Sequence, residues 1–135
     1  MTELVKNILA PVDGSKYMER NITYACDLAK SVGAKLTLLH VVTLPSLVPS
    51  ELPSVEPIAV LSVDVKPFQQ AGSRVVEDAR RIARQRDVDP ETRVERTFAN
   101  PAQSIINVAE EGKFDLIIIG DWGHSLLRNQ ILGSV

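Results

Sequence analysis

Residues 114–123 read FDLIIIGDWG, a run of aliphatic side chains that stops at a pair of glycines. Four consecutive aliphatic residues, Leu116 to Ile119, are typical of a strand that is covered on both faces in a parallel sheet. At Gly120 and Gly123 the backbone can bend sharply and approach a ligand without a Cβ in the way. This stretch therefore predicts a buried, central strand with a ligand-binding loop at its carboxyl end.

The rest of the chain alternates strand-like and helix-like segments. The expected strands are Asn7–Val12, Leu36–Val42, Arg93–Phe98 and Phe114–Ile119, of which residues 93–98 alternate polar and apolar side chains as an edge strand does. The expected helices cover residues 18–32, about 68–86 and 101–111. Such alternation predicts one α/β domain over residues 1–135, with an open, mostly parallel sheet and helices on both faces.

Several local features are also expected. Ser15 is expected to cap the first helix, and Asn100 the last one. Gln103 is expected to reach back toward Asn100 as in a capping box. The inward-facing side chains of the last helix are expected to be Ile105, Ile106 and Ala109, with Gly112 ending it.

The segment at about 44–66 differs in kind, because Pro45, Pro49, Pro53 and Pro57 recur at every fourth residue. A regular helix cannot hold that spacing, since interior prolines remove hydrogen bonds and clash with the preceding turn. A long surface excursion is expected. It is equally compatible with a lid or contact surface and with a tolerated insertion.

Composition limits the class of protein. The net charge of −2 argues against bulk nucleic-acid binding, although it allows one small phosphate ligand held mainly by backbone amides. A single cysteine, Cys26, allows no internal disulfide and is expected to be a buried small hydrophobe. No apolar run approaches about 20 residues and the amino terminus does not resemble a signal peptide. These features predict a cytoplasmic protein that does not span a membrane.

Two charged features have a structural interpretation beside a functional one. Arg80, Arg81, Arg84 and Arg86 resemble a basic patch, but acidic residues alternate with them, which favours a solvated helix face. His40 is expected to pack within its strand.

Gly133 and Ser134 give the pair Gly120 and Gly123 a chemical meaning. Gly133 and Ser134 can start a helix whose free amides face an anion, so the glycine loop and this helix start together would clamp a polyphosphate. The alternative is a simple turn and an unrelated later glycine. Neither a Walker A loop nor a GxGxxG dinucleotide signature is present.

The spacing G-x2-G-x9-G-[S/T] at Gly120, Gly123, Gly133 and Ser134 resembles the nucleotide-binding signature of the universal stress protein (UspA-like) family. Residues 7–15 (NILAPVDGS), 33–42 and 114–120 resemble the family's first, second and fourth strands. The resemblance covers the chain apart from the Pro-rich excursion. It implies a Rossmann-like, adenine-nucleotide α-hydrolase-like fold that binds ATP, ADP or AMP, with Mg²⁺ held mainly through phosphates.

The resemblance also implies the site. Pro11 and Asp13 would border the adenosine, and the backbone of Val41 would read the adenine edge. The residues expected around the phosphates are Gly120, Gly123, Gly133, Ser134 and Val135. His124 could donate to a phosphate or could be an exposed loop histidine, and Asp13 alone could merely close its turn.

Two departures from the family pattern stand out. Asp121 places a carboxylate in the phosphate loop, where it would weaken polyphosphate binding if it points inward and be harmless if it points outward. The family continues beyond Val135 with a final helix and a fifth strand that commonly builds the dimer interface, so these elements are missing from this sequence.

No Ser-His-Asp set, paired catalytic carboxylates or activated cysteine accompanies the glycines, so no dedicated catalytic activity is expected. The resemblance implies a stress-response or regulatory protein that dimerises, and we expect a homodimer that acts as a nucleotide-dependent switch on a regulatory protein partner. One alternative is a nucleotide-free interaction or dimerisation module of the same fold. A slow ATPase is less favoured.

Overall fold

A computed structural model describes residues 4–44, 66–98 and 100–120 of the chain. Four parallel strands form its sheet in the order β3-β2-β1-β4, so β1 lies between β2 and β4. The strands are β1 Asn7–Pro11, β2 Lys35–Thr43, β3 Glu91–Thr97 and β4 Leu116–Ile117. The expectation of a parallel α/β sheet is confirmed, as is the edge position of β3.

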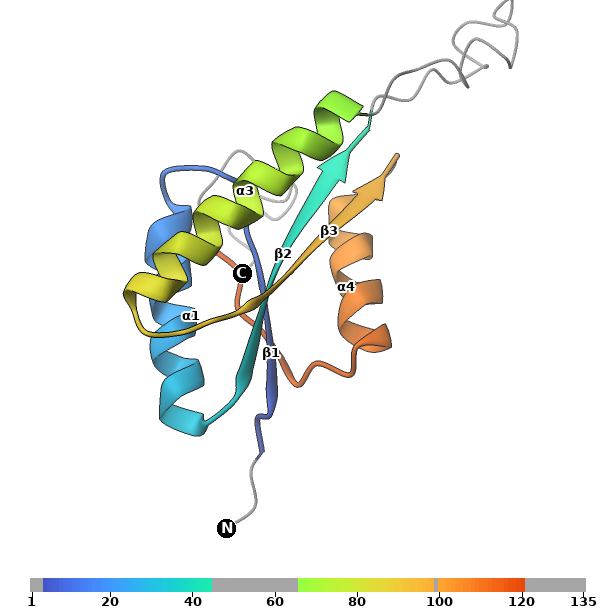
Figure 1. The fold of residues 1–135 in the computed structure, drawn as a ribbon. Coiled ribbons are helices and arrows are strands. Elements are labelled where there is room, and N and C mark those ends of the chain that lie inside the picture. Colours follow the sequence, from blue (N-terminus) through green and yellow to red (C-terminus); the bar gives the residue numbers. More distant parts are fainter. Residues whose placement is uncertain (1–3, 45–65, 99, 121–135) are drawn as a thin grey trace, which may run out of the picture.

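Helices cover both faces of this sheet (Figure 1). They are α1 Met18–Val32, α3 Lys66–Gln85 and α4 Pro101–Glu111. Two apolar clusters separate accordingly, because successive side chains of a strand point to opposite faces. Ile8 and Leu38 pack with α1 and α3, whereas Leu9 and Leu39 pack with Ile105 of α4. No helix in the described ranges is long and apolar enough to cross a bilayer.

The expectation that residues 114–119 form a buried central strand is wrong for the described part of the chain. There, β4 is a two-residue strand at the edge of the sheet. Ile117 is 37% exposed and Ile119 is 49% exposed, whereas Leu116 and Ile118 pack against the α1 side. The reason is that α4 lies against β2 and β3, which leaves the α4-side face of β4 uncovered by described residues.

The first helix does not begin as expected. Tyr17, not Ser15, is the residue that precedes α1, and it makes no side-chain cap. Ser15 acts one turn earlier: its hydroxyl accepts the Tyr17 N–H at 3.3 Å and its carbonyl accepts the Met18 N–H at 3.1 Å. The serine therefore closes the turn before the helix.

For the last helix, α4, one expectation is confirmed and two are wrong. Asn100 caps α4, since its Oδ1 accepts the Ala102 N–H at 2.9 Å. Gln103 does not reach back; it donates to Asn107 Oδ1 at 3.0 Å, the neighbour one turn later on the same face. Ile106 is 45% exposed, and Val108 is the second buried residue beside Ile105.

Cys26 is a free, buried cysteine, as the sequence predicts. Burial is the main cause that raises the pKa of its thiol.

Of the Pro-rich excursion, Leu44 and Lys66 are described, and residues 45–65 lie outside the described ranges. The Leu44 N–H donates to the Thr97 carbonyl at 2.8 Å, so β2 and β3 stay paired up to the start of the excursion.

A single carboxylate connects the start of β4 to the start of β1. Asp115 Oδ2 accepts the backbone N–H groups of Lys6 and Asn7 at 2.8 and 2.9 Å. These two hydrogen bonds favour the charged form and lower the pKa of Asp115 below its ordinary value. The strand edge is therefore held by hydrogen bonds that are strongest when the Asp115 side chain is ionised.

We predict that Asp115→Asn lowers the urea midpoint of unfolding at pH 7. Because the folded pKa of Asp115 lies below its unfolded value near 3.9, the contribution is complete above that pH and is lost as the pH falls through the folded pKa. Urea titrations of both proteins should therefore differ at pH 7 and converge on acidification. Asp78→Asn, which removes an exposed ion pair to Arg81, is the control and should change little. A difference between wild type and Asp115→Asn that is equal at all pH values would contradict the prediction.

Candidate functional site

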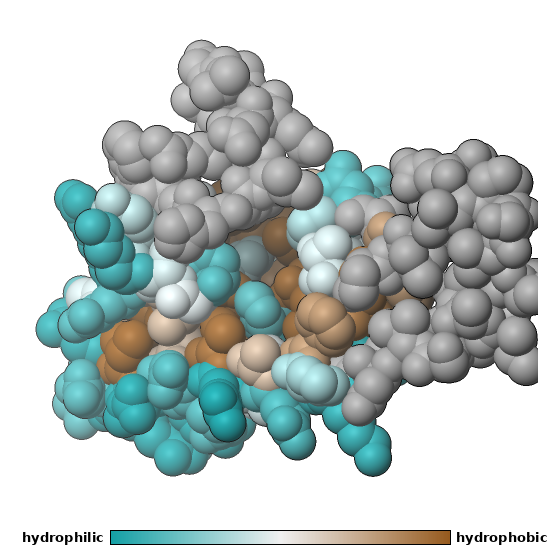
Figure 2. Space-filling model, turned by 90° about the horizontal axis from the view of Figure 1, so that it is seen from above, coloured by the Kyte–Doolittle hydropathy of each residue, from teal (hydrophilic) through white to brown (hydrophobic). Residues whose placement is uncertain are grey.

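The strand order reverses at β1, since β2 and β3 extend from one side of it and β4 from the other. Ligands of open α/β sheets bind beyond the carboxyl ends of strands at such a point. Pro11 and Asp13 follow β1 here, and Gly120 follows β4. Figure 2 views this end of the sheet and shows hydrophobic side chains exposed between rows of polar ones. The topology thus gathers these three predicted residues at one edge.

Pro11 ends the pairing between β1 and β4. The Leu9 carbonyl accepts the Ile118 N–H at 2.9 Å, so the next ladder donor to β4 would be the N–H of residue 11. Proline has no N–H, and Asn21 Nδ2 of α1 instead donates to the Ile118 carbonyl at 3.4 Å. The two strands are therefore released from each other immediately before the Asp13 turn.

Asp13 closes the turn that connects β1 to α1. Its Oδ1 accepts the Ser15 N–H at 2.9 Å, an Asx turn, so the structural role considered for this residue is present. Gly14 has a φ of +78°, which glycine adopts at little cost. A Cβ at Gly14 would also lie 3.1 Å from Val75 Cγ2, which shows that α3 packs closely against this turn.

Two side chains at this edge were not predicted to shape the site. His40 is half-buried, as its expected packing implies, but its Nδ1 also lies 2.7 Å from the Val12 carbonyl. Asn21 replaces the missing donor of Pro11. Neither contact has a signal in the sequence, because both depend on which strands are neighbours.

The remaining predicted residues of the site lie outside the described ranges. They are Gly123, His124, Gly133, Ser134 and Val135, and Asp121 lies outside as well. Val41 is half-buried near the carboxyl end of β2. In the described part of the chain, no three His, Cys, Asp or Glu side chains are grouped as a metal site.

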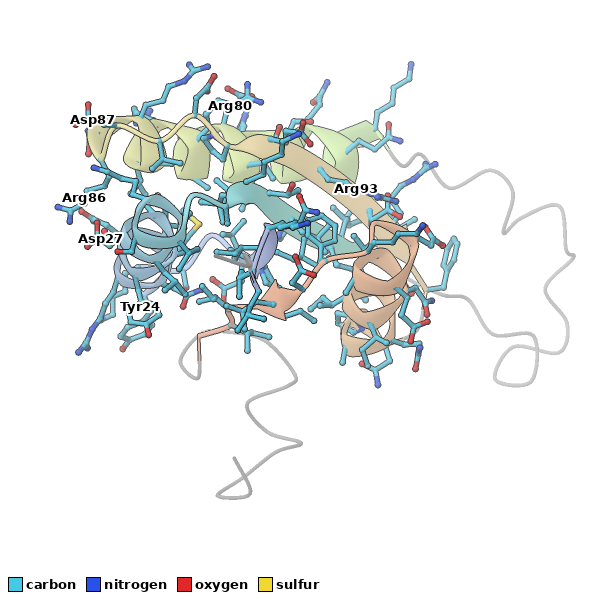
Figure 3. All side chains as sticks on the ribbon, turned by 90° about the horizontal axis from the view of Figure 1, so that it is seen from below. Tyr24, Asp27, Arg80, Arg86, Asp87 and Arg93 are labelled. Atoms are coloured by element: carbon cyan, nitrogen blue, oxygen red, sulfur yellow. The ribbon has the colours of Figure 1, made fainter. Side chains whose placement is uncertain are left out.

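Arg80, Arg81 and Arg84 of α3 and Arg86 just beyond it form a charged helix face, as the sequence favoured. Within the described residues each one has an acidic partner. The pairs are Arg80 with Glu77, Arg81 with Asp78, Arg84 with Asp89, and Arg86 with Asp27, at N···O distances of 2.9 to 3.2 Å. Figure 3 shows Arg86, just beyond the end of α3, and Asp27 of α1 pointing toward each other. Their charges are matched locally, which argues against a site for a large polyanion.

Two open hollows lie away from the strand-order reversal. One, of about 490 Å³, lies along the exposed face of α3 from Glu77 to Gln85. The other, of about 340 Å³, includes Asn7, Lys35 and Glu91, which begin three of the strands. We place the site at the opposite, carboxyl edge, because the backbone pairing ends there and ligands bind at that edge in folds of this kind.

Comparison with known proteins gives consistent matches over the chain. The model of the Universal stress protein family matches residues 5–135. Universal stress protein YxiE of Bacillus subtilis (strain 168) is 30% identical over 136 residues, covering 98% of this chain and 89% of that protein.

Solved structures agree on the fold. A universal stress protein family member from Burkholderia pseudomallei superposes with a TM-score of 0.70 at 24% identity, covering 99% of this chain and 93% of that one. A universal stress protein from Archaeoglobus fulgidus in complex with dAMP has a TM-score of 0.64 at 21% identity, covering 96% and 92%.

We predict that Gly14→Ala destabilises the protein more than Gly33→Ala does. Both glycines have positive φ values, +78° and +69°, so alanine costs about 1 kcal/mol of strain at either position. Only at Gly14 would the added methyl also press on Val75, since nothing lies within 4 Å at Gly33. The free energies of unfolding from urea titration measure the difference. Equal losses would mean that α3 does not brace the turn.

Proposed function

This chain belongs to the universal stress protein family, and from that premise we propose that it binds an adenine nucleotide at the carboxyl ends of β1 and β4. One observation carries the proposal: Pro11 ends the β1–β4 ladder two residues before Asp13, where the strand order reverses. The complex of the Archaeoglobus fulgidus relative with dAMP supports the choice of an adenine nucleotide.

The proposed contacts follow from the chemistry of each group. Pro11 and Asp13 border the adenosine. Asp13 Oδ1 accepts from Ser15, and Oδ2 would accept a ribose hydroxyl. The backbone of Val41 binds the base. The residues proposed around the phosphates are Gly120, Gly123, His124, Gly133, Ser134 and Val135.

The ligand is ATP, ADP or AMP, with Mg²⁺ held mainly by phosphate oxygens. Mg²⁺ keeps several waters and commonly binds through substrate phosphates, so it needs no dedicated set of protein ligands. The proposed role is a switch in a homodimer that contacts a regulatory protein. By linkage, a partner that prefers the nucleotide-bound form must tighten nucleotide binding by the same factor.

A second candidate function is supported by the edge of the sheet. Exposed Ile117 of β4 and Ile119 two residues further lie at this edge, beside backbone groups that described residues leave unpaired. Edge strands of this kind pair readily with another chain. An interaction or dimerisation module that needs no nucleotide is therefore the alternative.

Calorimetric titration with ATP-Mg²⁺, ADP and AMP tests the proposal. We expect the wild type to bind at least one of them, and Gly123→Val to weaken binding more than tenfold because its side chain would block the close approach of the backbone. Gly33→Ala, at the far end of α1, is the control and should bind as the wild type does.

A wild-type protein that gives no heat with any of the three nucleotides, and carries none when freshly purified and weighed by native mass spectrometry, would overturn the proposal. The same spectra report the oligomeric state. A dimer that forms equally with and without nucleotide would favour the interaction module.

A further inference from the structure

We infer that His40 is a positioning residue for the base: by binding the Val12 carbonyl, it leaves the backbone N–H and C=O of Val41 directed into the space beyond the end of β1. This inference rests on the proposed function, because it explains how Val41 becomes available to an adenine. It also predicts how the backbone of Val41 is hydrogen-bonded in the ligand-free protein, which can be tested separately.

The direction of the Val41 backbone follows from the alternation of the ladder. Alternate residues of a parallel strand bond to the same neighbour. The Val12 N–H donates to the Leu39 carbonyl at 2.7 Å, and on the other side the Leu44 N–H donates to the Thr97 carbonyl at 2.8 Å. Odd-numbered residues here therefore face β1 and even-numbered ones face β3. Val41 faces the β1 side, just beyond the end of that strand.

In a regular ladder the Val41 N–H would next donate to the Val12 carbonyl. That carbonyl instead lies 2.7 Å from His40 Nδ1. Because a carbonyl oxygen only accepts, Nδ1 must carry the proton. No hydrogen bond between Val41 and Val12 is found within the described residues. The imidazole thus replaces the ladder bond and ends the pairing of β1 with β2.

The ring of His40 lies on the face of the sheet that α3 covers. A methyl group on Gly72 would lie 2.8 Å from Val42 Cγ2, 3.1 Å from Val94 Cγ1 and 3.4 Å from His40 Cδ2. A glycine at this place in α3 therefore lets the helix lie close to the sheet. The ring of His40 thus lies in the contact between α3 and β2.

A free N–H and C=O on one residue match one kind of base edge. Adenine presents an amino donor beside a ring-nitrogen acceptor, whereas guanine presents a carbonyl acceptor in place of that amino group. The Val41 pair is thus complementary to adenine and would set two acceptors against each other with guanine. His40 thereby contributes to base specificity without touching the base.

Amide hydrogen exchange of the ligand-free protein, measured by NMR, tests the positioning role directly. In His40→Leu the Val12 carbonyl loses its donor, so the Val41 N–H should take its place and become more protected. A merely structural effect would lower protection, because destabilised proteins open more often. His40→Asn, whose amide can donate from nearly the position of Nδ1, should keep Val41 exchanging as in the wild type. Unchanged or lower protection of Val41 in His40→Leu would overturn the inference.

Titration with AMP and GMP tests the consequence for binding. His40→Leu should weaken AMP binding about fivefold to tenfold, the effect of roughly one hydrogen bond, and should reduce the preference for AMP over GMP. Val42→Ala is the matched control, because it contacts the same glycine from the same strand but bonds no part of the turn. Equal AMP affinities of His40→Leu and Val42→Ala would contradict the specificity role. If the wild type binds no nucleotide, the proposed function fails while the exchange result still decides the positioning role.

Discussion

The hydrogen bonding of β1 is the constraint on which the rest of the structure depends. At its start, β1 is held on both sides: its residues pair with β2 from Asn7 onward, and the Asp115 carboxylate accepts from Lys6 and Asn7 on the β4 side. At its end it is released on both sides, by Pro11 toward β4 and by His40 toward β2. The strand β1 is thus fully hydrogen-bonded at its start, and its pairing ends on both sides where we propose that the nucleotide binds.

The two faces of the sheet are completed to different degrees. On the side of α1 and α3, the apolar cluster is large and includes fully buried residues from both helices and two strands. On the side of α4, the cluster is small, because α4 lies over β2 and β3. This asymmetry explains why the aliphatic run of β4 is buried on one face and half exposed on the other within the described chain.

The sequence predicts the order of elements, because periodicity and glycines report local backbone preferences, and it points to the edge of the sheet at which we propose the site. It predicts Asn100 as a cap for the same reason. It fails where the outcome depends on neighbours. A run of four aliphatic residues does not reveal that one face of β4 lacks a covering helix. Likewise Asn21 and His40 gain their roles only once Ile118 and Val12 lie beside them.

Helix α3 links the end of the Pro-rich segment to the β1–α1 turn. It begins at Lys66, directly after that segment, and about 14 Å along its axis it presents Val75 to Gly14 of the β1–α1 turn. Just beyond its far end, Arg86 pairs with Asp27 of α1. Between these points α3 is packed on the sheet, with Val76 and Ala79 among its buried residues. One rigid element therefore carries both the residue that follows the Pro-rich segment and the side chain that packs against the turn. A substitution that shifts α3 on the sheet would change the shape of the turn while every residue of the turn stays the same.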